Sequence, residues 1–140
     1  PGLFICLNRS YASILEDLKK NNIDTKNILF VDCAKSRLCE MKKGTPNVIS
    51  VDTPADLTNL SISISEFAKN VPGEKFLAID TISTLLIYND ENIVVRFVKA
   101  LTEKTSGCGL KTIVLTQDNE SLIRKISLFF DKTVNLNLTG

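Results

Sequence analysis

The 140-residue sequence contains no histidine and no tryptophan. Without histidine the chain cannot build a Ser-His-Asp or Cys-His catalytic group, a histidine metal site or a histidine pH switch. A surplus of one charge is also missing, because 17 Lys and Arg against 16 Asp and Glu leave a net charge of +1. No overall field therefore draws the chain to nucleic acid or to an anionic membrane, and we expect neither as a partner.

Long apolar runs are missing as well. The longest mainly apolar run, Ile82 to Tyr88, is interrupted by Ser83 and Thr84 and is far shorter than the ~18 residues of a membrane span. The composition, with 44% hydrophobic and 24% charged residues, is that of an ordinary folded domain. We expect one domain over residues 1–140, in a cytoplasmic protein.

Four cysteines occur, at positions 6, 33, 39 and 108, and no two form a C-x-x-C pair. This spacing argues against a zinc site or a thioredoxin-like redox motif. Cys6 and Cys33 end apolar runs, where a thiol usually packs as a small buried hydrophobe. A Cys33–Cys39 disulfide is the alternative, although the cytoplasm keeps thiols reduced.

Continuous apolar runs of strand length recur along the chain and suit strands buried on both faces of a parallel sheet. A shorter strand is expected over 47–51. Near the end of the chain Val134, Leu136 and Leu138 alternate with polar residues, which predicts an edge strand. The four long runs cover residues 3–7, 28–32, 76–80 and 112–116.

Segments with helical spacing alternate with these strands. Ser10 is expected to cap a helix from Tyr11 to Lys20, and Asn119 to cap a later one. Thr53 followed by Pro54 predicts the start of another helix. Further expectations are a loop over 35–47, a short helix or turn over 81–88, and a helix after Asn89-Asp90 that ends at Gly107 or Gly109. Alternation of this kind predicts a three-layer α/β/α fold with a mostly parallel sheet covered on both faces.

Polar residues follow nearly every predicted strand. In open α/β sheets ligands bind at the carboxyl ends of the strands, so these side chains are expected along one edge. The simpler alternative is that each caps the next helix, which is worth about 0.5–2 kcal/mol. The pairs are Asn8-Arg9, Asp32-Cys33, Asp52-Thr53, Asp80-Thr81 and Thr116-Gln117.

Asp80 is the sharpest of these candidates. Four apolar residues lead into Asp80-Thr81, which matches the end of a Walker B strand, where the acid holds Mg²⁺ directly or through water. The pattern alone is common, because many buried strands end in an acid.

A resemblance to a known family starts from this strand. The run Phe-Leu-Ala-Ile-Asp-Thr-Ile-Ser-Thr-Leu-Leu-Ile-Tyr-Asn-Asp at 76–90 resembles the Walker B region of KaiC-type ATPases of the RecA superfamily. Residues 3–11 and 22–33 resemble the strand–helix units that follow the P-loop helix in that family. The similarity extends over nearly the whole chain and is to small archaeal KaiC-like proteins. It implies a RecA-like sheet.

The departures from the family bear on catalysis. No G-x-x-x-x-G-K-[ST] occurs, and Lys42-Lys43-Gly44-Thr45 lacks its glycine spacing and is expected to be a solvated loop. Asn8-Arg9 stands where active relatives carry paired glutamates, and neither residue can act as a general base. Of the catalytic parts only Asp80 is left, so we expect no ATP hydrolysis and at most weak binding of Mg²⁺-ATP.

Two further residues are candidates for the site, and the resemblance gives a role to the first. Gln117 occupies a place where RecA-like proteins often put a polar sensor of the γ-phosphate, and the alternative is a loop or helix-capping residue. Arg9 could meet a phosphate or a neighbouring subunit, and the alternative is a solvated side chain.

In the family the P-loop strand lies inside the sheet, and its loss would leave unpaired backbone beside buried strands. We therefore expect residues upstream of Pro1 to supply a strand with a degenerate phosphate loop. A swapped partner or a rearranged sheet is the alternative. On this hypothesis the domain at 1–140 is incomplete at its N-terminus.

Two functions follow as expectations. The first is a non-catalytic regulatory, signalling or scaffolding module that binds a protein partner or itself. Ile93 and Val95 are candidates for that contact, unless they lie under a neighbouring loop. The second is a fragment of a working ATPase whose P-loop lies upstream of Pro1. A small-molecule or phosphate-binding enzyme using Asp80, Thr81 and Gln117 is a weaker third reading.

Overall fold

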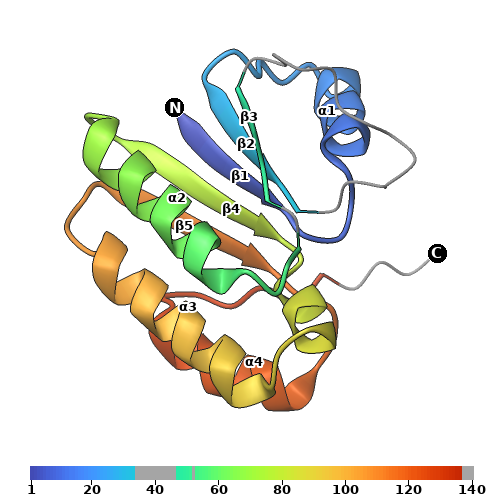
Figure 1. Cartoon of the computed structure of the whole chain (residues 1–140), viewed down its shortest axis with the longest axis vertical. Coiled ribbons are helices and arrows are strands. Elements are labelled where there is room, and N and C mark those ends of the chain that lie inside the picture. Colours follow the sequence, from blue (N-terminus) through green and yellow to red (C-terminus); the bar gives the residue numbers. More distant parts are fainter. Residues whose placement is uncertain (34–46, 52, 137–140) are drawn as a thin grey trace.

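In the part of the chain that the structure describes, the strands form one five-stranded sheet in which every pair of neighbouring strands is parallel. The computed structural model describes residues 1–33, 47–51 and 53–136 (Figure 1). The sheet order is β3-β2-β1-β4-β5, which confirms the predicted α/β class and its parallel sheet. The strands are β1 (Gly2–Cys6), β2 (Ile28–Asp32), β3 (Val48–Ser50), β4 (Lys75–Asp80) and β5 (Leu110–Leu115).

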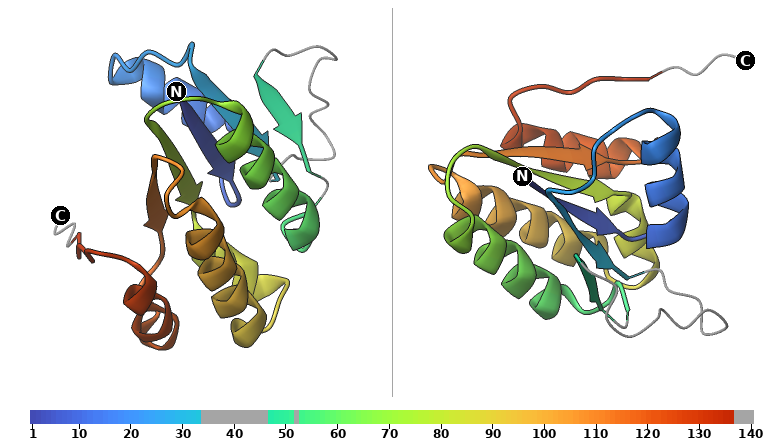
Figure 2. Two further views of the ribbon diagram at one scale, coloured as in Figure 1. Left: turned by 90° about the vertical axis from the view of Figure 1, so that its left-hand side faces the viewer. Right: turned by 90° about the horizontal axis from the view of Figure 1, so that it is seen from above.

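Helices lie on both sides of the sheet and give the three layers that were predicted (Figure 2). Helices α2, α3 and α4 share one face and α1 lies on the other, so the two faces are covered unequally. Short 3-10 helices follow β4 and α4. The bounds are α1 (Tyr11–Lys20), α2 (Leu57–Asn70), η1 (Ile82–Ile87), α3 (Glu91–Thr105), α4 (Glu120–Ile126) and η2 (Ser127–Phe129).

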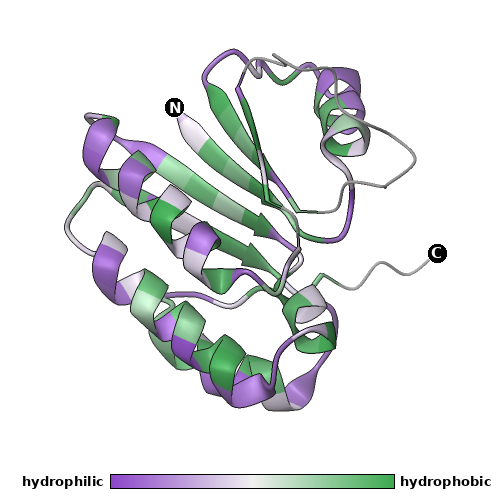
Figure 3. Cartoon of the chain, in the orientation of Figure 1, coloured by the Kyte–Doolittle hydropathy of each residue, from purple (hydrophilic) through white to green (hydrophobic). Residues whose placement is uncertain are grey.

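The larger core fills the face under α2, α3 and α4. Alternate strand residues such as Leu3 and Ile79 point into it and meet Ile64 of α2 and Val94 and Val98 of α3, all almost fully buried. Figure 3 shows the matching pattern, with apolar and polar residues alternating along both helices. Because successive strand residues point to opposite faces, the other half of each strand is left for the second core.

The smaller core lies between α1 and the strands that it covers. Its members are Cys6, Ile14, Ile28 and Phe30 with partly buried aromatic neighbours. The Tyr11 ring meets the Phe30 ring edge-on at 4.9 Å between centroids. The aromatic contact therefore ties the first turn of α1 to β2.

Helix α3 starts after Asp90 as predicted, and of the three other predicted helix starts two are confirmed and one is wrong. Ser10 accepts a hydrogen bond from the Ser13 amide at 3.3 Å, and Asn119 caps α4 in the same way. Helix α2 does not start at Thr53, because that hydroxyl is engaged by the Ala55 amide at 3.2 Å in a local turn. The Asp56 carboxylate caps α2 instead, accepting from the Asn59 amide at 3.1 Å.

The predicted edge strand is not formed in the described part of the segment. Residues 131–136 form no strand and Leu138 lies outside the described residues, so β5 is the edge of the sheet among the residues that the structure describes. Strand β5 was expected to be buried on both faces, yet Ile113 is 55% exposed and Leu115 is 41% exposed. The physical reason is that α1 packs over β1 and β2, and within the described residues no helix covers β5 on that side.

Of the remaining predictions, some are confirmed and others concern residues that the structure does not describe. The short helix after β4 is confirmed as η1, and α3 ends just before Gly107, whose φ is +81°. Cys6 and Cys33 are buried free thiols, as predicted. Residues 35–46 of the predicted loop over 35–47, with Cys39 and Lys42-Lys43-Gly44-Thr45, lie outside the described residues, as does Asp52. Within the described part of the chain, every helix is too short or too polar to cross a membrane.

Candidate functional site

The sheet order creates a switch point between β1 and β4. From β1 the chain moves to β2 and β3 on one side, and then crosses to β4 on the other side of β1. In open α/β sheets the crevice outside the carboxyl ends of such strands is the usual ligand site. The carboxyl ends of β1 and β4 are joined here by a 2.8 Å hydrogen bond from the Leu7 amide to the Asp80 carbonyl.

Four of the five predicted site residues meet at this point. Asn8 and Arg9 follow β1 after Leu7, and Asp80 and Thr81 stand at the end of β4. The parallel pairing of β1 with β4 therefore brings together two pairs that lie far apart in the sequence.

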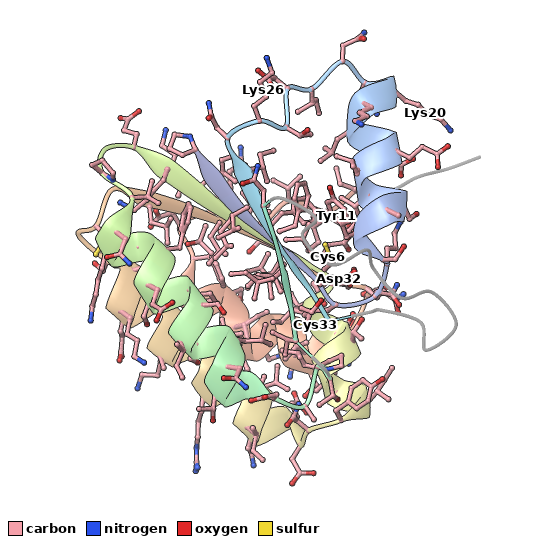
Figure 4. The ribbon with its side chains drawn as sticks, turned by 45° about the horizontal axis from the view of Figure 1, so that its top comes forward. Cys6, Tyr11, Lys20, Lys26, Asp32 and Cys33 are labelled. Carbon is pink, nitrogen blue, oxygen red and sulfur yellow. The ribbon has the colours of Figure 1, made fainter. Side chains whose placement is uncertain are left out.

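A row of three side chains crosses the sheet at the same level. Cys6 is the register partner of Asp32 on β2 and of Asp80 on β4. Register partners in a parallel sheet share a face, so the Cys6 thiol has the carboxyl group of Asp32 on one side and that of Asp80 on the other. Figure 4 shows Cys6, Asp32 and Tyr11 gathered between the sheet and α1. The two aspartates were identified from the sequence separately, but Cys6 was missed as their neighbour, because only the strand order places it between them.

The Cys6 thiol has low reactivity. Burial raises its pKa well above the ordinary value, and the nearby Asp32, Cys33 and Asp80 raise it further. Burial likewise raises the pKa of Cys33, which faces the larger core, to about 12. Since the thiolate is the reactive form, both cysteines are poor nucleophiles at neutral pH.

Asp32 fastens α1 to the sheet. Its residue is only 2% exposed, and its carboxylate accepts a 3.3 Å hydrogen bond from the amide of Tyr11, the first residue of α1. A carboxylate at this end of a helix also meets the positive end of the helix dipole. The structure therefore gives Asp32 an anchoring role.

Asp80 is the partly exposed acid of the row. Its carboxylate accepts a hydrogen bond from the Thr81 hydroxyl, and the peptide bond between the two residues is cis. Mg²⁺ commonly takes one or two carboxylates and fills its shell with water and phosphate oxygens, and Asp80 fits the carboxylate part of such a shell. Among the described residues no group of three or more His, Cys, Asp or Glu side chains comes together to hold a metal.

Arg9 is exposed and engaged with its own helix. Its guanidinium pairs with the Asp17 carboxylate and donates to the Ser13 hydroxyl at 2.9 Å. The charge is thus directed along α1. A contact of Arg9 with a phosphate at Asp80 would require this pairing to open.

Gln117 stands apart from the other four. It follows β5, and its amide donates a 3.2 Å hydrogen bond to the Ser83 hydroxyl on η1. The bond fixes the end of β5 to the 3-10 helix beside Asp80. The predicted residue is therefore held one strand away from the switch point.

Two cavities lie away from this site. One of about 700 Å³ is bounded by β5, α4 and residues 132–136. The other, of about 290 Å³, lies beside η1 and is lined by Tyr88, Asp90 and Ile93 among others. Neither of the two is lined by Asn8, Arg9, Asp80 or Thr81.

Comparison with known proteins assigns the chain to a family whose description names no activity. No curated protein matches the sequence. A family model described only as a family of unknown function matches residues 4–136, which takes in the described strands from Phe4 onward and the described helices. The chain therefore belongs to the DUF7504 family.

Proposed function

We propose that the chain is a non-catalytic, KaiC/RecA-like domain that acts as a regulatory, signalling or scaffolding module. It binds a protein partner or a second copy of itself, and binds Mg²⁺-nucleotide weakly at most. The observation that carries the proposal is the make-up of the switch point, where Asn8 and Arg9 stand beside Asp80 and Thr81.

A hydrolase would need a general base within hydrogen-bond reach of its nucleophile. Asp80 is the one acid of these four residues, and its carboxylate already accepts from Thr81. The nearby Asp32 is buried and accepts from α1. This arrangement favours binding over hydrolysis.

Support for a protein partner comes from the surface beside η1. Ile87, Tyr88 and Ile93 are exposed apolar residues around the smaller cavity. Clustered apolar residues with a tyrosine are typical of protein contacts. Val95, the other candidate for a contact, packs against the larger core instead.

Three further parts of the proposal have separate support. A cytoplasmic location is supported by thiols that are free among the described residues, and an archaeal source by the KaiC-like resemblance. The resemblance to RecA-like domains is supported by the parallel sheet and by the position of Asp80 at its carboxyl edge.

The proposal is tested by thermal unfolding in the presence of Mg²⁺-ATP and Mg²⁺-ADP. Ligand binding stabilises a protein by RT ln(1 + [L]/Kd), so at 1 mM nucleotide a Kd of 1 mM or weaker gives at most about 0.4 kcal/mol, or roughly 2 °C. We expect a shift no larger than this. Asp90→Asn is the matched control, because Asp90 is exposed and makes no side-chain cap to α3.

The contrary result would be a large shift that Asp80→Asn abolishes and Asp90→Asn keeps, together with release of phosphate from ATP. That result would favour the alternative function, in which the chain is a fragment of a working ATPase. Self-association is tested separately by light scattering over a concentration series. An Ile87→Ser, Tyr88→Ser variant should shift any dimer toward monomer, whereas Leu128→Ser, an exposed apolar change on η2, should not.

A further inference from the structure

The free edge of β5 lies beside a second extended segment. Among the residues that the structure describes, strand β5 pairs with β4 alone. Residues 132–136 follow η2 and line the 700 Å³ cavity together with Thr112 to Thr116. An unpaired strand edge is a template for another strand, and the nearest candidate is this part of the same chain.

The sequence of that segment suits a strand. Val134 and Leu136 alternate with polar residues and are 62% and 73% exposed. On β5 the exposed apolar residues are Ile113 and Leu115, which have the same spacing of two. One register can therefore place all four side chains on the same face, where cross-strand apolar pairs stabilise a sheet.

The topology permits the same pairing. About a dozen residues or more are needed to connect parallel strands, usually through a helix, and the 17 residues 116–132 contain α4. Helix α4 packs against α3 on the same face of the sheet. A strand beyond β5 would thus be reached by a crossover of the same hand as β4-α3-β5, and uniform right-handed crossovers are the rule.

The direction is also suitable. Figures 1 and 2 show the segment after η2 running in the same general direction as β5. Because η2 ends at Phe129 and Thr133 lies four residues later, the segment is tethered next to the edge. Such a short tether gives a high effective concentration that favours its own chain over a second copy.

We propose that residues 133–136 close onto β5 as a sixth parallel strand, so that the C-terminal segment is a strap for the open edge of the sheet. In the closed form the order becomes β3-β2-β1-β4-β5 followed by the strap. The cavity between them is the space that closure removes. The strap competes with any other strand for the same edge.

Amide hydrogen exchange of the full chain, followed by NMR, tests the proposal. In the wild type we expect protection of those amides of residues 111–115 that do not bond to β4. The variant Val134→Asp, Leu136→Asp should exchange them at least tenfold faster. Leu128→Asp is the control, because it places the same charge on an exposed apolar site of η2, and it should leave them unchanged.

Asn135→Pro removes a backbone donor without adding charge and should have the same effect as the double variant. The proposal is overturned if these amides are unprotected in the wild type, or if both strap variants leave their protection intact. Protection that rises with protein concentration would also overturn it, because the strand would then come from a second copy.

Discussion

The Phe76 ring lies over Gly2, its register partner on β1, so closely that a Cβ at position 2 would overlap the ring atoms. Both residues are on the face of the sheet that carries α1, and Phe76 packs against the smaller core there. Glycine is therefore required at position 2 for a steric reason that concerns its neighbour, since the ring occupies the volume of the missing side chain.

The variant Gly2→Ala should destabilise the fold by about 1–3 kcal/mol, the usual cost of overpacking a filled site. Urea unfolding followed by circular dichroism measures this loss. In a Phe76→Leu background the same substitution should cost much less, because the smaller side chain makes room. Equal costs in both backgrounds would show that the ring is not responsible.

The true start of α2 can be tested with a matched pair of variants. Asp56→Ala removes the carboxylate that caps the Asn59 amide and should lower the free energy of unfolding by about 0.5–2 kcal/mol. Thr53→Ala removes only a bond within the preceding turn and should have a smaller effect. If Thr53→Ala were the more harmful change, the cap assigned to Asp56 would be wrong.

Lys75 joins two turns at the amino end of the sheet. Its ammonium group is buried and donates to the carbonyls of Cys108 at 2.6 Å and of Gly73 at 3.3 Å. Lys75→Met keeps the length of the side chain but leaves these carbonyls without their donor, so we expect a loss of about 1–3 kcal/mol in urea unfolding. Lys69→Met, on the exposed side of α2, should change stability by less than about 0.5 kcal/mol.

Alkaline pH should weaken the fold through the buried thiols. The pKa of Cys33 is about 12 in the folded chain against 9.0 for an ordinary thiol, so the folded state holds this proton more tightly than the unfolded state. The contribution is complete below pH 9 and is lost as the pH rises toward 12, with a slope of up to about 1.4 kcal/mol per pH unit.

Urea unfolding between pH 8 and pH 10.5 measures this slope. Cys33→Val should reduce the slope and leave the part that comes from Cys6, because valine has no proton to lose and keeps a similar apolar volume. Cys108→Val is the control, since Cys108 is only partly buried. A slope that is the same in all three proteins would assign the pH dependence to other groups.

Local chemistry explains which features were predictable. Ser10 and Asn119 cap helices through bonds within three residues, and the strands appear as continuous apolar runs. The exposure of Ile113 depends instead on how far α1 reaches across the sheet, which no local pattern shows. The same limit explains the edge, since alternation in 134–138 suits a strand whether or not the segment is paired.

In the candidate site, too, some features follow from local sequence and others from the order of the strands. Asp80 and Thr81 are visible as the end of an apolar run, whereas the neighbours of Asp80 depend on the strand order. The sequence allows Arg9 to contact a phosphate, whereas in the structure its guanidinium pairs with Asp17. Arg9 and Asp17 are eight residues apart, with the N-cap and the first turns of α1 between them, and no standard sequence spacing predicts an ion pair there.

The central place of β1 has a consequence for how the chain folds. Strand β1 is complete by residue 6, but its partner β4 begins only at Lys75, so the middle of the sheet joins parts of the chain that are far apart. Pairings of this kind form slowly, because a long loop must close before they contribute. During synthesis β1 can pair with β2 first, but its pairing with β4 can form only after the segment that ends in Asp80 has left the ribosome.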